Sequence, residues 1–183
     1  MKKWLSVFGL LVVAVLLTPL AVQAETITRL TFSGPAGEYI SQGQSYVYTP
    51  ADGTFIVTHD SHNGVTVQFS TPTRPWLWTL QFGGPNATAP EVGVYTDCWR
   101  YGFNNVHPGV ALWGDGRGCN ELRGTFEVKQ IVYSEFDVAS VWVTFTQYCD
   151  NQLNPVTGEF IFNVDAATPT RSTSWGRLKT IYR

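Results

Sequence analysis

Aromatic side chains are the residues of this sequence with the most evident chemistry. The chain holds 7 Trp, 8 Tyr and 11 Phe among 183 residues. Trp and Tyr rings on the surface of a β-sheet stack well on sugar rings and on partner side chains, and their polar groups add hydrogen bonds. The rings near predicted turns or on a predicted outward face are the candidate binding residues: Trp99, Tyr101, Trp113 and Trp142.

Strand parity decides which indoles are expected at the surface. Trp76 and Trp78 share the parity of Leu80, so both are predicted to lie in the core. Trp142 has the opposite parity to the apolar face that begins at Val141, so it is predicted to be the more exposed ring.

Arg117 lies in a glycine-rich turn and completes the set of candidate binding residues. Asp115, Asn120 and Glu121 surround it, but their spacing departs from the twelve-residue calcium loop. The turn is therefore predicted to be structural, with Asp115 or Asn120 bonded to local backbone. Two interpretations of the guanidinium stay open: it binds a carboxylate or phosphate ligand, or it pairs with an acidic neighbour and holds the turn.

Two further polar clusters resemble catalytic or metal-binding groups. His59-Asp60-Ser61-His62 offers metal ligands, but zinc needs three or four and no further ligand has suitable spacing. It precedes Asn63-Gly64, which is typical of tight hairpins, so we predict a polar hairpin tip without metal or cofactor. Glu135 and Asp137 are paired carboxylates as in sugar hydrolysis, but they fall in a predicted turn where side chains are solvated. No catalytic residue is assigned.

The elements that position these side chains are β-strands. Period-two alternation, which indicates a strand with one buried face, recurs over 65–69, 76–82, 126–132, 141–145 and 160–164. Further strands are predicted over 26–33, 44–49, 54–59, 92–97 and 109–113.

Short strands with turn residues every 8–12 positions predict an all-β fold: an antiparallel β-sandwich, jelly-roll-like, with about 8–10 strands. An outer-membrane barrel is disfavoured because its strands need about 9–11 residues. Residues 25–164 are assigned to the sandwich and residues 165–183 to a polar C-terminal tail.

Residues 1–24 have the three-part order of a secretory signal peptide. Lys2 and Lys3 precede an apolar stretch from Leu5 to Leu17, and cleavage is predicted after Ala24. The stretch is shorter than the roughly 20 apolar residues of a membrane span, so an uncleaved anchor is the less favoured alternative. The mature protein is predicted to be periplasmic or extracellular, without a membrane span.

Cys98, Cys119 and Cys149 all lie in the mature part. In an exported chain, cysteines are read first as disulfide partners. Three cannot all pair within one molecule, and the residues leave the pairing open because Cys98 can pair with either of the others. An unpaired cysteine is most often buried.

The stretch from Arg100 to Val164 resembles a family of exported bacterial β-domain proteins. The motifs that carry the resemblance are Gly116-Arg117-Gly118-Cys119-Asn120, Phe145-Thr146-Gln147-Tyr148-Cys149 and Gly158-Glu159-Phe160-Ile161-Phe162-Asn163. The resemblance implies a β domain and a disulfide between Cys119 and Cys149, and it implies no reaction. Cys98 departs from the pattern.

Charge and composition limit the function. With Lys2 and Lys3 removed, 10 basic residues stand against 14 acidic ones, a net charge of −4. Such a domain is poorly suited to nucleic acid. The leading interpretation is a non-enzymatic exported module that binds a glycan or an envelope protein. A secreted enzyme that acts on polysaccharide through carboxylates and a structural element of the envelope are the alternatives.

Overall fold

The computed structural model describes residues 25–135 and 137–166, which form ten β-strands and one short 3-10 helix. The strands are β1 (Thr26–Ser33), β2 (Ser45–Tyr48), β3 (Thr54–His59), β4 (Val65–Thr71), β5 (Arg74–Gly83), β6 (Gly93–Arg100), β7 (Gly109–Gly114), β8 (Leu122–Tyr133), β9 (Val138–Cys149) and β10 (Val156–Asp165), and the helix is η1 (Pro85–Ala87). Each predicted strand is found, and the predicted bounds of β1 and β3 agree with the structure. The prediction of an all-β fold is confirmed.

The predicted signal peptide and most of the predicted tail, residues 167–183, lie outside the described residues. Within the described ranges, no helix has the length and hydropathy needed to cross a membrane.

Alternation along each strand separates a buried face from an outer face. In β8, Leu122, Phe126 and Val128 are buried while Arg123 and Glu127 are exposed. The cause is the pleat of the strand, which points successive side chains to opposite sides of the sheet. The core therefore lies between inward faces that the sequence marks by parity.

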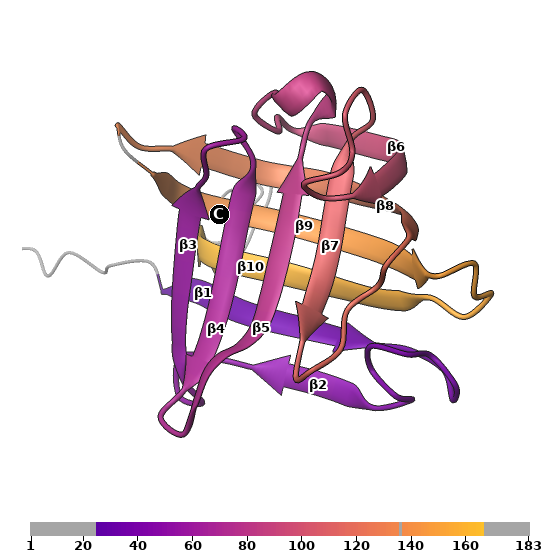
Figure 1. Ribbon diagram of the computed structural model, residues 1–183. Helices are drawn as coiled ribbons and strands as arrows, with labels where there is room; N and C mark the ends of the chain where they lie inside the picture. Colours follow the sequence, from indigo (N-terminus) through magenta and orange to yellow (C-terminus); the bar gives the residue numbers. More distant parts are fainter. Residues whose placement is uncertain (1–24, 136, 167–183) are drawn as a thin grey trace, which may run out of the picture.

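The strands form one continuous sheet in the order β2-β1-β10-β9-β8-β6-β7-β5-β4-β3. Neighbouring strands are antiparallel, except that β6 and β7 are parallel. The sheet is curled, so that β3, β4, β5 and β7 cross in front of β1, β10, β9 and β8 (Figure 1). The two layers of this sandwich-like arrangement are thus the two halves of a single half-barrel sheet.

Aromatic contacts join the two layers across the core. Phe32 of β1 meets Trp78 of β5 edge to face, with ring centroids 4.7 Å apart. Phe82 of β5 lies 5.6 Å from Phe126 of β8. Such pairs contribute about 0.5–1.5 kcal/mol each beyond the apolar area that they bury.

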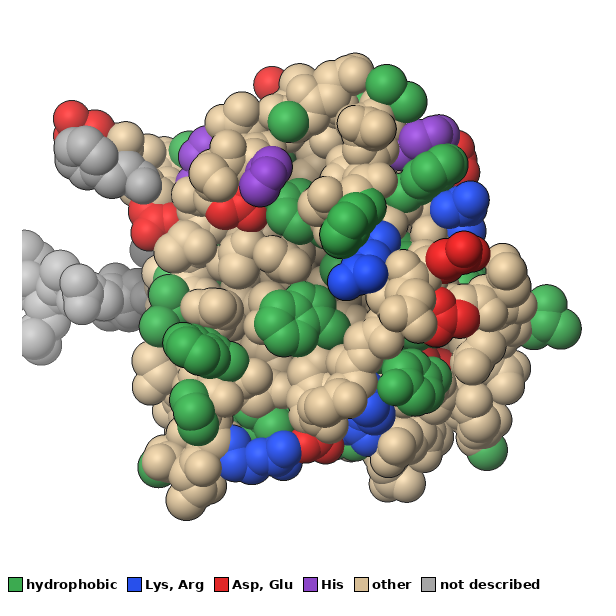
Figure 2. All heavy atoms as spheres, in the orientation of Figure 1, with side chains coloured by type: hydrophobic (Ala, Val, Ile, Leu, Met, Phe, Trp, Pro, Cys, Tyr) green, Lys and Arg blue, Asp and Glu red, His purple; other side chains and the backbone are tan. Residues whose placement is uncertain are grey.

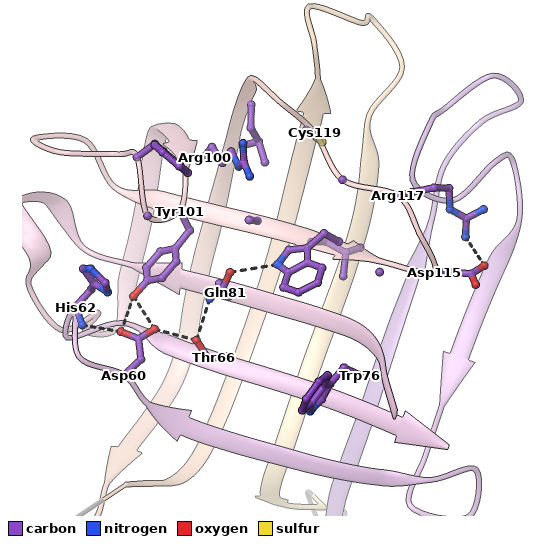
Figure 3. A pocket seen from close by; sticks show the side chains of 18 of the residues that line it. Asp60, His62, Thr66, Trp76, Gln81, Arg100, Tyr101, Asp115, Arg117 and Cys119 are labelled. Atoms are coloured by element: carbon purple, nitrogen blue, oxygen red, sulfur yellow. Dashed lines mark hydrogen bonds and ion pairs between the residues drawn. The ribbon is translucent and has the colours of Figure 1, made fainter. Parts of the chain in front are cut away.

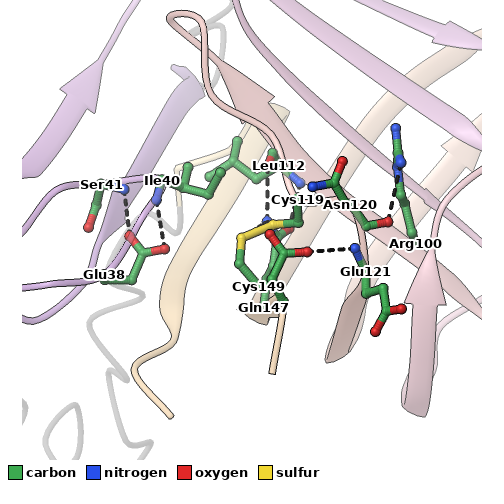
Figure 4. The surroundings of a disulfide bond; sticks show 11 residues. Glu38, Ile40, Ser41, Arg100, Leu112, Cys119, Asn120, Glu121, Gln147 and Cys149 are labelled. Carbon is green, nitrogen blue, oxygen red and sulfur yellow. Dashed lines mark hydrogen bonds between the residues drawn. A yellow bond between two sulfur atoms is a disulfide. The ribbon is translucent and has the colours of Figure 1, made fainter. Parts of the chain in front are cut away.

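One edge of β7 is closed by a side chain instead of a strand. β6 pairs with β7 only at Gly109 and Val110. Beyond them, the N–H of Leu112 donates to Oε1 of Gln147 at 2.6 Å, and Nε2 of Gln147 donates to the Leu112 carbonyl at 3.0 Å (Figure 4). The Gln147 amide, fully buried on β9, thereby bonds β7 as a neighbouring strand would.

A disulfide joins Cys119 and Cys149 beside this amide, with the Cα atoms 5.0 Å apart (Figure 4). The predicted pairing is confirmed, and Cys98 is the free cysteine. Its thiol is fully buried, as expected of an unpaired cysteine. Burial raises the pKa of the Cys98 thiol to about 12, which keeps it protonated and unreactive.

Candidate functional site

The outer face of β4, β5 and β7 carries a hollow of about 730 Å³, which we call the outer hollow. On this face a few separate hydrophobic side chains stand among polar atoms (Figure 2). The lining combines aromatic, amide, hydroxyl and charged side chains from strands and loops far apart in the sequence (Figure 3). The outer hollow therefore offers aromatic, hydrogen-bonding and charged groups in one place.

Trp113 lies in the outer hollow on β7, between the buried residues Leu112 and Gly114. It is 41% exposed, and its Nε1–H donates to Oε1 of Gln81 at 3.2 Å. The indole is thus held by one hydrogen bond from a neighbouring strand while part of its ring stays open to solvent. Trp113, a candidate binding residue of the sequence analysis, thus lies at the surface.

Trp76 also lines the outer hollow, and the prediction that it lies in the core is wrong. It is 63% exposed, whereas Trp78 is buried as predicted. The pairing of β4 with β5 shifts register between Phe69 and Thr71, and the φ of Trp76 is 47°. This left-handed backbone interrupts the alternation and turns the indole outward. The backbone N–H of Trp76 donates to Oγ of Ser70 at 2.9 Å.

The conformation of Trp76 is costly for a bulky residue. A left-handed φ in a non-glycine residue costs about 1–2 kcal/mol. Such outliers persist where the surroundings hold them, and they cluster at binding sites. Trp76 is thus a mostly exposed indole in a left-handed backbone conformation at the border of the outer hollow.

A chain of hydrogen bonds crosses the outer hollow from Trp113 to Asp60 (Figure 3). Gln81 accepts from Trp113 and donates through Nε2 to Oγ1 of Thr66 at 3.2 Å. Thr66 donates in turn to Oδ2 of Asp60 at 2.8 Å. Every donor in this chain points toward the carboxylate, so the orientations of the side chains are mutually determined.

Tyr101 anchors the loop that follows β6 on the β3–β4 turn. Its hydroxyl lies 2.7 Å and 2.8 Å from the two carboxylate oxygens of Asp60, to which it donates. The ring is buried against Gly64 and Gly83, where any β-carbon would collide with it. Tyr101 therefore borders the outer hollow as a structural anchor, not as the exposed platform that its choice as a binding residue implied.

Hydrogen bonds keep the Asp60 carboxylate ionised. Burial alone raises its pKa, but the bonds from Tyr101, from Thr66 and from the backbone N–H groups of His62 and Gly64 together lower the pKa below 3.8. Burial, followed by the bond to Asp60 and its charge, raises the pKa of Tyr101. At neutral pH the pair is thus a carboxylate and a neutral phenol.

We expect Asp60→Asn to lower the free energy of unfolding by about 1–3 kcal/mol at pH 7, because hydrogen bonds to an ionised acceptor are lost. The lowered pKa places this stabilisation above the unfolded-state pKa of about 3.9, and it disappears as the pH falls through the folded-state value. Urea unfolding at pH 7 and at pH 3 should therefore show a smaller difference between wild type and variant at the lower pH. Glu127→Gln, an exposed change on β8, serves as the control; a difference that does not depend on pH would contradict this role of Asp60.

Arg117 is held by an acidic neighbour, the second of its two interpretations. Its guanidinium pairs with Asp115 at 2.9 Å, and Arg74 pairs with the same carboxylate. The Arg117 side chain is 10% exposed and lies over the Trp78 ring. The Asp115 carboxylate thus pairs with arginine side chains, where the sequence predicted a bond to local backbone. Arg117 holds the turn at the border of the outer hollow.

Trp142 and Trp99 lie away from the outer hollow. Trp142 is on the outward side of β9, in the other layer, where Lys129 covers its ring at 5.0 Å and Glu159 accepts from its Nε1–H at 2.8 Å. It is partly buried. Its ring has partners of its own, so we assign it no part in the site.

Trp99 on β6 lies between two side chains. The guanidinium of Arg123 is 4.3 Å from its ring on one side, and the imidazole of His107 stacks at 4.3 Å. His107 also contacts Asp97 through Nδ1 at 3.0 Å. Protein groups thus occupy the surroundings of Trp99, and its role here is packing.

The two other polar clusters form turns, as predicted. Asp60 accepts from the N–H of Gly64 in the β3–β4 hairpin, and Asp137 ends the turn between β8 and β9. Asp137 also accepts from the N–H of His59, which joins the two turns. No group of three or more His, Cys, Asp or Glu side chains suited to a metal occurs in the described part of the chain.

The residues of the outer hollow that sequence reasoning did not select include Thr66, Trp76, Gln81 and Arg100. Thr66 and Gln81 have outward parity on β4 and β5, so a search for polar residues on the outward face could have found them. Trp76 and Arg100 carried no local signal, because a register shift and a loop contact place them.

No family model, curated protein or solved structure matches this chain.

Proposed function

We propose that the protein is an exported binding module that holds a glycan in the outer hollow without transforming it. The observation that carries the proposal is the pair of exposed indoles, Trp76 and Trp113, beside a row of hydrogen-bonding side chains. Sugars present C–H faces that stack on aromatic rings and hydroxyl groups that bond polar side chains. The outer hollow offers both kinds of contact.

The size of the outer hollow supports a small portion of a glycan as the ligand. Its volume of about 730 Å³ lies within the usual range of about 300–1,000 Å³ for small-molecule sites. The hydrogen-bond chain from Trp113 to Asp60 holds the polar groups in position before a ligand arrives. Preorganisation of this kind reduces the entropy lost on binding.

The state of the carboxylates favours binding over hydrolysis. A glycosidase needs a carboxylic acid with a raised pKa and a second carboxylate across the bond. Of the two acidic residues in the lining, Asp60 has a lowered pKa, and Asp115 is paired with two arginines. Glu135 and Asp137 lie in the β8–β9 turn and are not part of the lining.

The proposed location is the periplasm or the extracellular space. A disulfide is compatible with an oxidising compartment. The predicted signal peptide over residues 1–24 supports export independently, because such segments direct a chain out of the cytoplasm.

We expect Trp113→Ala to weaken glycan binding by about 10- to 30-fold, because the loss of a central aromatic contact costs about 2 kcal/mol. Trp76→Ala should have a similar effect. Residues 25–183 would be screened on a glycan array, and the best oligosaccharide would then be titrated by calorimetry against wild type and variants.

Tyr148→Ala is the matched control, because Tyr148 is an exposed aromatic residue on β9 outside the outer hollow. It should bind like wild type. Unfolding curves would show that each variant is folded. An array without any retained glycan, or unchanged affinity in both tryptophan variants, would reject the proposed function.

A further inference from the structure

Most of the charged side chains that line the outer hollow have several polar partners within the protein. Asp115 is paired with Arg74 and Arg117. The Asp60 carboxylate accepts hydrogen bonds from four residues, two through their side chains and two through their backbone N–H groups. Arg100 also lines the hollow, and no carboxylate among residues 25–135 and 137–166 lies within ion-pair distance of it. Of the two arginines in the lining, Arg100 is therefore the one without an acidic partner in the described part of the chain.

The Arg100 guanidinium is held in place by contacts that leave its charge available. It lies 4.8 Å from the centroid of the Phe103 ring, and its Nη1–H donates to the carbonyl of Asn120 at 3.3 Å (Figure 4). Phe103 is 70% exposed, so this stack stands at the surface. An arginine has five N–H donors, of which this carbonyl takes one.

The support of Arg100 is itself anchored. Asn120 follows Cys119, which the disulfide ties to β9, and Arg100 precedes Tyr101, which is fixed on Asp60. Two separate anchors thus hold the guanidinium at the edge of the hollow, above Gln81 in the view of Figure 3.

We propose that the glycan bound in the outer hollow is acidic, and that Arg100 binds the carboxylate of a uronic-acid-type sugar. This inference rests on the proposed function. A planar guanidinium matches a carboxylate through two parallel hydrogen bonds, which are stronger than bonds between neutral groups. The partly buried position of Arg100 strengthens the attraction, since solvent screens the pair less than at an open surface.

The negative net charge of the predicted mature chain means that an acidic glycan would have to be attracted by a local positive charge. Overall, the predicted mature chain carries a charge of −4, so acidic polymers are not attracted by the protein as a whole. Selection for a carboxylated sugar must then come from a local cation. Arg100 supplies that cation next to the aromatic residues on which the sugar ring stacks.

The experiment compares carboxylated oligosaccharides with matched forms in which the carboxylates are reduced to alcohols. The probes are oligogalacturonates and oligoguluronates, and calorimetry measures the affinity of wild type, Arg100→Gln and Arg100→Lys. Arg100→Gln should weaken binding of the carboxylated probe by about 10- to 100-fold and leave binding of the reduced probe within 2-fold. Arg100→Lys keeps the charge but loses the planar fork, and its affinity should lie between the other two.

Arg123→Gln is a close control. Arg123 also stacks on an aromatic ring, donates to a backbone carbonyl and lacks an acidic partner in the described residues, but it lies outside the outer hollow. Its replacement should leave both affinities unchanged. Unchanged binding of the reduced probe by Arg100→Gln also shows that the hollow is intact.

The possible outcomes separate this inference from the proposed function. If a glycan binds and Trp113→Ala weakens it, but Arg100→Gln binds the carboxylated probe like wild type, the acidic ligand is rejected and glycan binding stands. Tighter binding of sulfated oligosaccharides than of carboxylated ones rejects the carboxylate. If neither acidic nor neutral glycan binds, the proposed function itself is rejected.

Discussion

Replacement of Gln147 by leucine is expected to lower the free energy of unfolding by about 2–6 kcal/mol. The variant leaves both the N–H and the carbonyl of Leu112 without their partner in a fully buried position. Each unpaired buried group costs about 1–3 kcal/mol. Since leucine is close to glutamine in size, the loss comes from the hydrogen bonds and not from a cavity.

Urea unfolding followed by tryptophan fluorescence measures this change. Gln130→Leu is the control, because Gln130 lies on β8 and, within the described residues, donates one hydrogen bond, to the hydroxyl of Ser140. The control should lose no more than about 1.5 kcal/mol, the usual value of one such bond. If Gln147→Leu were no less stable than the control, the edge of β7 would not depend on this amide.

Removal of the disulfide by Cys119→Ser and Cys149→Ser together is expected to cost about 3–4 kcal/mol. The bridge joins residues 30 positions apart, and in the chain-entropy model a loop of that length restricts the unfolded chain by this amount. The folded state is affected as well, because Nε2 of Gln147 lies 3.0 Å from Sγ of Cys119.

The double serine variant would be compared with wild type in urea unfolding, in the presence and absence of a reductant. Cys98→Ala is the control, since it removes the thiol that forms no bridge. Wild type should lose stability on reduction, whereas the double variant should not respond. A wild type that is equally stable with and without reductant would show that the bridge contributes little.

The strands were predictable because alternation is a local property. Residues 26–33 and 54–59 were predicted within their observed bounds. Val65, Val67 and Phe69 are buried, as their parity requires. Neighbouring residues alone set this pattern, so it needs no knowledge of which strands pair.

The two tryptophans of β5 show where parity fails. Trp78 follows the alternation and is buried, but Trp76 has a left-handed backbone next to a register shift and points outward. The shift depends on how β4 pairs with β5, which is a contact between segments. The same limit applies to Trp142, whose outward parity was correct but whose ring is covered by Lys129 from β8.

Local sequence was sufficient for the all-β class, the strand positions and the turn at Arg117, because these follow from residue types a few positions apart. The candidate binding site required the folded chain. Trp113, Gln81 and Arg100 come together because β7 pairs with β5 and because Tyr101 anchors its loop on Asp60. Those contacts join residues far apart in the chain. Their free energies depend on which strands pair and which side chains are buried, and a short stretch of sequence does not determine either.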